Sequence, residues 1–247
     1  MGERTIPGRI VVAASPVQVA EQSAARLSLV LREAASKGGA ATMALSGGNS
    51  PRQAYARLAR EPGVDWDKVR VFWVDERAVP PTDDRSNYRW AKAELLDHAP
   101  IPATHVHRMA AERSDRAAAA IEYEKLIREH VRADGDGVPS FDAVVLGVGD
   151  DGHTASLFPG DTAVAITDRL VLAVPAQAAR EARLTLTAPA IIHARHVFVI
   201  AIGAGKRPAL ERVWKRDGDV HVTPARIIRE CRGSVTWIVD EAADGVN

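Results

Sequence analysis

Residues 147–159 read Gly-Val-Gly-Asp-Asp-Gly-His-Thr-Ala-Ser-Leu-Phe-Pro, and they follow the short apolar run 141–146, FDAVVL. An apolar run of this length, followed at once by turn residues, is typical of a buried strand. A simple turn after a strand would need only one Gly or Asn. This strand is followed by three glycines, two carboxylates and an imidazole. The stretch therefore predicts a buried strand that ends in a functional site.

Strands and helices alternate on both sides of this stretch. Strands are predicted at 9–14, 41–45, 69–74, 105–109, 141–146, 170–174, 183–187, 197–202 and 235–239. Helices are predicted at 16–37, 51–58, 86–96, 115–131 and 206–214. Such alternation favours an α/β fold, with a mostly parallel sheet, helices on both faces and a small additional strand-containing excursion near 170–187. The chain shows no linker-like composition, so we expect one domain over residues 1–247.

The overall composition limits which partners the protein can bind and in which compartment it is expected. Lys plus Arg and Asp plus Glu both number 32, so no overall field favours nucleic acid or an anionic membrane. Cys231 is the only cysteine, which excludes an internal disulfide and suits a reducing compartment. Residues 1–9 lack the apolar segment of a signal peptide, and no stretch reaches the roughly 18 apolar residues of a membrane span. We therefore expect a soluble, cytoplasmic protein.

In a sheet of this kind, ligands bind beyond the carboxyl ends of the strands. The first such end is Ser46-Gly47-Gly48-Asn49-Ser50-Pro51, which runs from a strand into a helix. Glycines would let a phosphate approach the free N–H groups of the helix N-terminus, where the helix dipole favours negative charge. The alternative is a purely structural turn in which Asn49 or Ser50 caps the helix. The segment matches neither a dinucleotide fingerprint nor a P-loop.

Charged residues follow two further strands. Asp75-Glu76-Arg77 comes directly after the apolar run 71–74, where a solvated loop is the plain alternative. Lys206 follows Gly203-Ala204-Gly205, and its ammonium is a suitable point charge for a phosphate, although a lone lysine usually faces solvent. The residues Ser86-Asn87 are expected only to start the next helix.

His153 is a candidate general base, because an imidazole titrates near neutral pH and can pass a proton from water to a leaving oxygen. Asp151 could orient that ring, and the neighbouring glycines could offer N–H groups to a developing oxyanion. The alternative is a histidine that caps or packs against a following short helix. No third ligand at metal-site spacing accompanies His105 and His107, so no metal site is predicted. A serine triad is also disfavoured, because no G-x-S-x-G follows a strand.

The motifs SGGNSP (46–51), VDERAVP (74–80), SNY (86–88), GVGDDGHTASLFPG (147–160) and GAGK (203–206) occur in the order seen in one family. The chain resembles the 6-phosphogluconolactonases of the oxidative pentose phosphate pathway from residue 46 to about residue 208. That resemblance implies a Rossmann-like fold, shared with glucosamine-6-phosphate deaminases. It also implies hydrolysis of 6-phospho-D-glucono-1,5-lactone to 6-phosphogluconate without a cofactor, and no nucleic-acid, membrane or obligatory protein partner.

By this resemblance His153 matches the catalytic histidine and Asp151 its neighbouring acid, while Arg77, Arg183 and Lys206 match basic residues at the substrate. The remaining candidate substrate-binding residues are Ser46, Gly47, Gly48, Asn49 and Asp75. The chain departs from the family at 48–51, which usually reads Gly-Ser-Thr-Pro, and at 175–180, which is usually rich in Pro and Lys. The second departure leaves open whether Arg77, Arg180 or Arg183 dominates phosphate binding.

Two other functions fit parts of the same pattern. The isomerase-deaminases of this fold continue after Asp-Gly-His to an Asn-Glu-Pro segment, whose carboxylate relays protons. Here Phe158 stands where that acid would be, and a phenyl ring cannot relay a proton. A non-catalytic sugar-phosphate sensor would keep the turn at 46–51 and Lys206 but would have no need of His153 beside Asp151.

Overall fold

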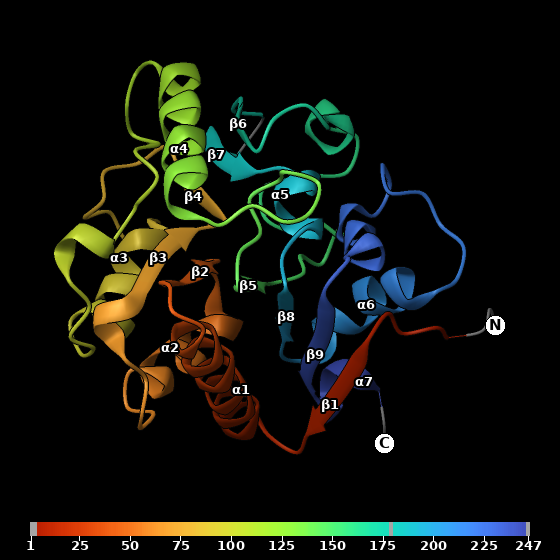
Figure 1. Cartoon of the computed structure of the whole chain (residues 1–247). Coiled ribbons are helices and arrows are strands. Elements are labelled where there is room, and N and C mark those ends of the chain that lie inside the picture. The colour runs from red at the N-terminus through yellow and green to blue at the C-terminus, as the bar shows by residue number, and fades with distance from the viewer. Residues whose placement is uncertain (1–3, 178–179, 246–247) are drawn as a thin grey trace.

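Two sheets organise the chain in the computed structural model, which describes residues 4–177 and 180–245 (Figure 1). The larger sheet has six strands in the order β1-β9-β8-β5-β2-β3, and every neighbouring pair is parallel. These strands are β1 (Arg9–Ala13), β2 (Ala41–Leu45), β3 (Val69–Trp73), β5 (Ala143–Leu146), β8 (His196–Ala201) and β9 (Ser234–Asp240). The smaller sheet is antiparallel, in the order β4-β7-β6. Its strands are β4 (Asp75–Arg77), β6 (Val171–Val174) and β7 (Arg183–Leu186).

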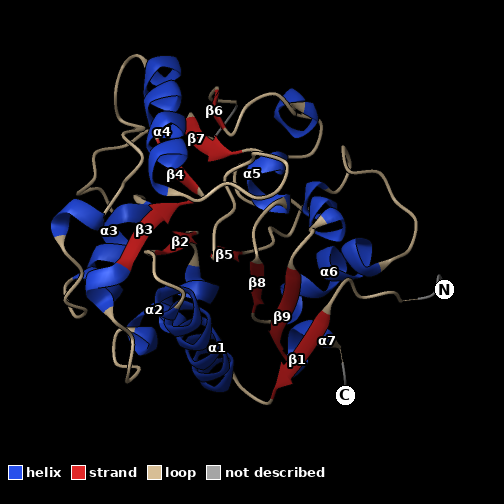
Figure 2. Cartoon of the chain, viewed as in Figure 1, coloured by secondary structure: helices blue, strands red, loops and turns tan. Residues whose placement is uncertain are grey.

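Helices cover both faces of the large sheet. The α-helices of the described residues are α1 (Pro16–Ser36), α2 (Asn49–Leu58), α3 (Asn87–Ala91), α4 (Arg116–His130), α5 (Ala188–Ile192), α6 (Arg207–Trp214) and α7 (Glu241–Asp244). Figure 2 shows α1 and α2 on one side of the strands and α5 and α6 on the other. Both β2 and β5 are buried over their whole length, as strands covered on two faces should be. The predicted α/β fold, with its small additional excursion, is confirmed.

The helix α1 illustrates how local sequence fixes an element. The hydroxyl of Ser15 accepts a hydrogen bond from the Gln18 N–H, and Pro16 occupies the first helical position. An apolar stripe that includes Leu27 and Leu31 is fully buried. This stripe packs against β2, β8 and β9, so α1 crosses the sheet from β1 to β2 on one face.

One predicted strand is wrong. Residues 105–109 make only an isolated bridge between Val106 and Val71, and one hydrogen bond from the His107 N–H to the Val71 carbonyl. The alternating pattern there has another cause, since the His107 ring stacks on Phe72 at 4.6 Å between centroids and Met109 enters the core. Packing on the edge strand therefore replaces pairing with it.

Other elements differ from the sequence expectation at their boundaries or were not predicted. The segment 75–77 pairs with β7 as strand β4 instead of forming a loop. The helix expected over 86–96 consists of α3 followed by a π-helical turn, Lys92–Leu96. The short helices α5 and α7 and the 3-10 segment Pro224–Glu230 were not predicted. Residues 178 and 179, within the segment that departs from the family, lie outside the described residues.

Within the described parts of the chain, no helix has both the length and the apolar composition needed to cross a bilayer.

His107 should make the fold sensitive to acid. Burial, helped by the neighbouring His130, Arg70 and His105, lowers the pKa of His107 to about 4. The unfolded chain binds this proton near pH 6.5 and the folded chain does not, so stability is lost as the pH falls. Between about pH 6.5 and 4, the free energy of unfolding should fall by about 1.4 kcal/mol per pH unit from this group. Urea denaturation of wild type and His107→Phe across this range measures the difference, and equal pH slopes would contradict it.

Candidate active site

A polar cavity of about 320 Å³ opens beyond the carboxyl ends of β2, β5 and β8, beside the small sheet. From β2 the chain continues to β3, at one edge of the sheet, whereas from β5 it continues in the opposite direction to β8 and β9. The strand order therefore reverses between β2 and β5, and in such folds ligands bind in the crevice at this topological switch point. The lining residues are Ser46 to Pro51, Asp75, Arg77, Asn87, Gly147, Val148, Gly149, His153, Ala155, Arg183, Ile200, Ile202 and Lys206. The structure thus brings together every residue that the sequence predicted for the site except Asp151, which lies behind His153.

The turn after β5 fixes the imidazole of His153 against Asp151. The Asp151 Oδ1 atom accepts a hydrogen bond from the His153 backbone N–H, at 3.0 Å, and is 2.6 Å from the His153 Nδ1 atom. Gly149 packs so closely against the ring that a Cβ atom there would overlap it. This close approach requires a glycine.

The hydrogen bonds to Asp151 keep its carboxylate ionised. Partial burial by itself would raise the pKa of Asp151, but the His153 N–H and the imidazole outweigh burial and hold that pKa below its usual value. An ionised Asp151 favours a ring proton on Nδ1, and a neutral imidazole in that tautomer has its lone pair on Nε2. The side chain of His153 is one-third exposed, so Nε2 can meet a ligand in the cavity.

Two of the three glycine N–H groups in this stretch do not play the part that the sequence suggested. The Gly149 N–H donates to the His153 carbonyl and the Gly152 N–H donates to the Gly149 carbonyl, both at 2.9 Å. These two donors stabilise the turn, so they are not available to an oxyanion.

The turn after β2 opens the N-terminus of α2 towards the cavity. Gly48 is the N-cap residue, with φ at +95°, and no side chain caps the helix there. The alternative in which Asn49 or Ser50 caps the helix is therefore wrong. Gly47 lies against the Asn87 side chain with no room for a Cβ atom. The uncapped N–H groups of the first turn are suited to an anion.

Three cations surround the same cavity. Arg77 on β4 lies directly opposite Arg183 on β7, so two like charges are paired across the small sheet. The Nη1 atom of Arg183 is 3.7 Å from the Asp75 carboxylate. Burial lowers the pKa of Arg183; the Asp75 charge opposes this shift and the Arg77 charge adds to it. The ammonium of Lys206 is 2.7 Å from Asp150. A ligand anion would relieve the repulsion between the two guanidinium groups.

Several buried polar atoms at this cavity have no hydrogen-bond partner among the described residues. They are the Oγ atom of Ser46, the Nε atoms of Arg77 and Arg183, and the Oδ1 atom of Asn87. Buried polar groups are usually hydrogen-bonded, so a cluster of exceptions on one cavity wall marks a place for a polar ligand.

Asp75 belongs to the wall of the site. It is 5% exposed, and it accepts hydrogen bonds from the Ser156 Oγ at 2.6 Å and the Asn87 Nδ2 at 3.1 Å. Asn87 and Ser156 were not expected as site residues. Asn87 is 12 residues and Ser156 is 81 residues from Asp75, and the contacts that bring both side chains to the cavity form only in the folded chain.

The next residue, Glu76, is also buried. Burial raises the pKa of Glu76, although it accepts bonds from Ser86 and from the N–H groups of Arg77, Asn87 and Tyr88. Glu76 therefore anchors the start of α3 to β4 and holds Asn87 at the cavity.

The structure distinguishes the three arginines that the sequence left as alternatives for phosphate binding. Arg77 and Arg183 line the cavity, whereas Arg180 does not. Arg180 instead pairs with Asp161 at 2.7 Å and stacks on the Phe158 ring.

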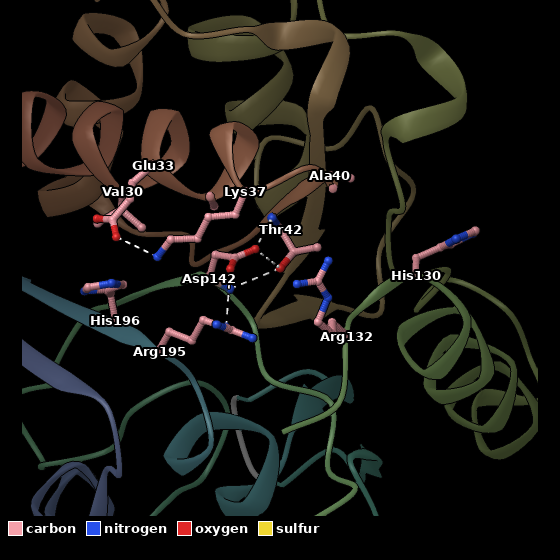
Figure 3. A pocket seen from close by; sticks show the side chains of 12 residues that line it. Val30, Glu33, Lys37, Ala40, Thr42, His130, Arg132, Asp142, Arg195 and His196 are labelled. Atoms are coloured by element: carbon pink, nitrogen blue, oxygen red, sulfur yellow. Dashed lines mark hydrogen bonds and ion pairs between the residues drawn. The ribbon is translucent and has the colours of Figure 1, made fainter. Parts of the chain in front are cut away.

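A second cavity, of about 140 Å³, lies at the opposite edge of the sheet, near the amino ends of β2, β5 and β8 (Figure 3). Two of its cations already have carboxylate partners: Lys37 is 2.7 Å from Glu33, and Arg195 is 3.5 Å from Asp142. Asp142 also accepts two bonds from Thr42, which joins the starts of β2 and β5. The polar side chains of this cavity mainly join neighbouring elements at the edge of the sheet.

One group of side chains within the described residues has metal-ligand spacing. It consists of Asp134, Asp136 and His193, and it is remote from the cavity at the switch point. His193 is hydrogen-bonded to Asp134, and Asp136 is paired with Arg232. These groups therefore satisfy one another. His105 and His107 do not lie on a strand, because residues 105–109 form none.

Comparison with known proteins gives consistent matches over most of the chain. The profile of the family described as glucosamine-6-phosphate isomerases/6-phosphogluconolactonase matches residues 14–237. The 6-phosphogluconolactonase of a Synechocystis species is 38% identical over 213 residues, which cover 86% of this chain and 87% of that relative. The 6-phosphogluconolactonase of Streptomyces coelicolor is 37% identical over 234 residues, which cover 91% and 89% of the two chains.

Solved structures agree with this placement. The 6-phosphogluconolactonase of Trypanosoma brucei superposes with a TM-score of 0.85 at 29% identity, over 100% of both chains. A monomeric glucosamine-6-phosphate deaminase superposes with a TM-score of 0.80 at 17% identity, over 97% of this chain and 100% of that one. The second likeness concerns the fold alone.

Proposed function

The chain belongs to the glucosamine-6-phosphate isomerase/6-phosphogluconolactonase family, and from this premise we propose that it hydrolyses 6-phospho-D-glucono-1,5-lactone to 6-phospho-D-gluconate. This is the lactone-hydrolysing step of the oxidative pentose phosphate pathway, carried out by residues 1–247 as one domain. The observation that carries the proposal is the meeting of the His153–Asp151 pair with Arg77, Arg183 and Lys206 at one cavity. A base and an anion-binding wall are what a phosphorylated lactone requires.

In the proposed reaction, the Nε2 atom of His153 takes a proton from water while the resulting hydroxide adds to C1 of the lactone. The tetrahedral intermediate then collapses, the bond from C1 to the ring oxygen breaks, and the imidazolium returns the proton to that oxygen. Asp151 keeps Nδ1 protonated and stabilises the imidazolium. No covalent bond to the enzyme is formed.

The phosphate would lie between the N-terminus of α2 and the three cations. Arg77 and Arg183 can form paired hydrogen bonds to phosphate oxygens, and Lys206 supplies a point charge. Contacts so far from the reacting carbon place C1 next to His153, so that binding to the phosphate supports the chemical step.

The alternative of an isomerase-deaminase is disfavoured by the residue packed on the base. Phe158 contacts His153, with 4.6 Å between ring centroids, in the segment where those enzymes carry a carboxylate. An aromatic ring can orient an imidazole, but it cannot transfer a proton during ring opening.

The purified protein should accelerate hydrolysis of 6-phosphogluconolactone and release no ammonia from glucosamine 6-phosphate. Lactone turnover should also survive a chelator, because the proposed mechanism uses only His153 and water. The measurement is disappearance of the lactone, with and without the chelator, beside an ammonia assay. Ammonia release without lactone turnover would overturn the proposed function, and loss of turnover in the chelator alone would overturn the metal-free mechanism.

A further inference from the structure

The turn that follows the catalytic histidine contains an aromatic side chain that packs on it. The ring of Phe158 lies 4.6 Å from that of His153, with a 40° angle between the planes, and Phe158 is 8% exposed. The hydrogen bond to Asp151 fixes only the Nδ1 edge of the imidazole. Contact with the Phe158 face restricts rotation of the ring about that edge. The position of Phe158 therefore determines where Nε2 points.

Phe158 is in turn contacted by an arginine from a different part of the chain. The Cζ atom of Arg180, in the connection between β6 and β7, lies 3.8 Å from the Phe158 ring centroid. Its guanidinium donates to the Asp161 carboxylate at 2.7 Å, and the Gln177 side chain donates to the same carboxylate at 3.1 Å. Phe158 and Asp161 are the two ends of one turn, joined by the Asp161 N–H bond to the Phe158 carbonyl. Arg180 therefore holds both ends of that turn.

We propose that Arg180 and Phe158 are positioning residues, which hold the His153 imidazole in its reactive orientation through the contacts Asp161–Arg180–Phe158–His153. This inference rests on the proposed function for the identity of His153 as the base. Arg180 itself lines no part of the cavity, and its charge is neutralised by Asp161. Its contact with the base runs through Phe158.

The kinetic test uses Arg180→Ala and Phe158→Leu with 6-phosphogluconolactone as substrate. Both variants should lose about tenfold in kcat with little change in KM, because a small displacement of a catalytic group lowers the rate of the chemical step. The double variant should be no slower than Phe158→Leu, because Arg180 acts through Phe158. Arg180→Lys should recover only part of kcat, since an ammonium keeps the ion pair with Asp161 but lacks the planar stack.

Arg52 offers a matched control. Its guanidinium is paired with Glu94 at 2.7 Å and lies 3.5 Å from the Trp90 ring centroid, which is the same arrangement without a histidine beyond it. Arg52→Ala should leave kcat close to that of wild type. An equal loss in Arg52→Ala and Arg180→Ala would overturn the proposal, and so would a raised KM with unchanged kcat in Arg180→Ala, because that result would place Arg180 on the substrate.

A measurement without substrate separates this inference from the proposed function. The imidazole nitrogen NMR signals of His153, assigned with His153→Ala, should show one ring environment in wild type and in Arg52→Ala. In Arg180→Ala they should shift or broaden as the ring gains further orientations. Unaltered His153 signals in Arg180→Ala would overturn the positioning role, whatever reaction the enzyme catalyses. If the signals change but the protein has no lactonase activity, the proposed function fails and the positioning of His153 stands.

Discussion

Replacing His153 with alanine should lower kcat for 6-phosphogluconolactone by about 10²–10⁴-fold, the range typical of a lost acid–base group. The expectation is large because one imidazole serves both halves of the proposed reaction. It takes the proton from water before C1 is attacked and gives it to the ring oxygen as the lactone opens. KM should change little, since the proposed phosphate contacts lie on other residues. Initial-rate kinetics on the folded variant measure both quantities.

Asp151 provides a graded comparison. Asp151→Asn keeps the size of the side chain but removes the charge that fixes the ring proton on Nδ1, so it should reduce kcat less than His153→Ala does. A folded His153→Ala enzyme with near-normal kcat would mean that the base lies elsewhere. A larger loss in Asp151→Asn than in His153→Ala would reverse the two roles.

Removal of Lys206 or Arg77 should lower kcat/KM for the phosphorylated lactone by about 10–150-fold. This range corresponds to the loss of charge-assisted hydrogen bonds worth about 1.5–3 kcal/mol. Lys206 must first leave Asp150, which is 73% exposed. Such an exposed ion pair contributes less than about 1 kcal/mol, so the exchange does not cancel the gain from phosphate. Steady-state kinetics of Lys206→Ala and Arg77→Ala test the two cations separately.

The control substrate is glucono-1,5-lactone, which lacks the phosphate. Wild type should already be poor on it, and Lys206→Ala and Arg77→Ala should match wild type there. Arg207 is the matched control residue, because it adjoins Lys206 but pairs with Glu211 and lies outside the cavity. Inorganic phosphate should inhibit wild type more than either variant. If Lys206→Ala lost the same factor on both lactones, Lys206 would serve the carbonyl or the fold instead of the phosphate.

The sequence by itself was sufficient for the fold class and for grouping the candidate site residues at one edge of the sheet. Hydrophobic runs of strand length alternate with helical periods, and local interactions set both patterns, so the order of β2, α2, β5, β8 and α6 could be predicted. Parallel strands bring their carboxyl ends to one edge, which allowed 46–51, 147–153 and Lys206 to be assigned to one candidate site. The closeness of His153 and Asp151 also follows from the sequence, because only two residues separate them.

Tertiary structure alone decided which side chains meet from distant parts of the chain. Pairing of β4 with β7 placed Arg183 opposite Arg77 and turned Arg180 towards Phe158, so it separated arginines that look equivalent in sequence. The strand predicted at 105–109 failed because His107 packs on Phe72 at the sheet edge. Asp75 and Ser156 are 81 residues apart and form one buried hydrogen bond. The local sequence determines turns and hydrophobic periodicity within a few residues. These contacts depend instead on how whole strands pair, and that pairing is specified only by the packed core.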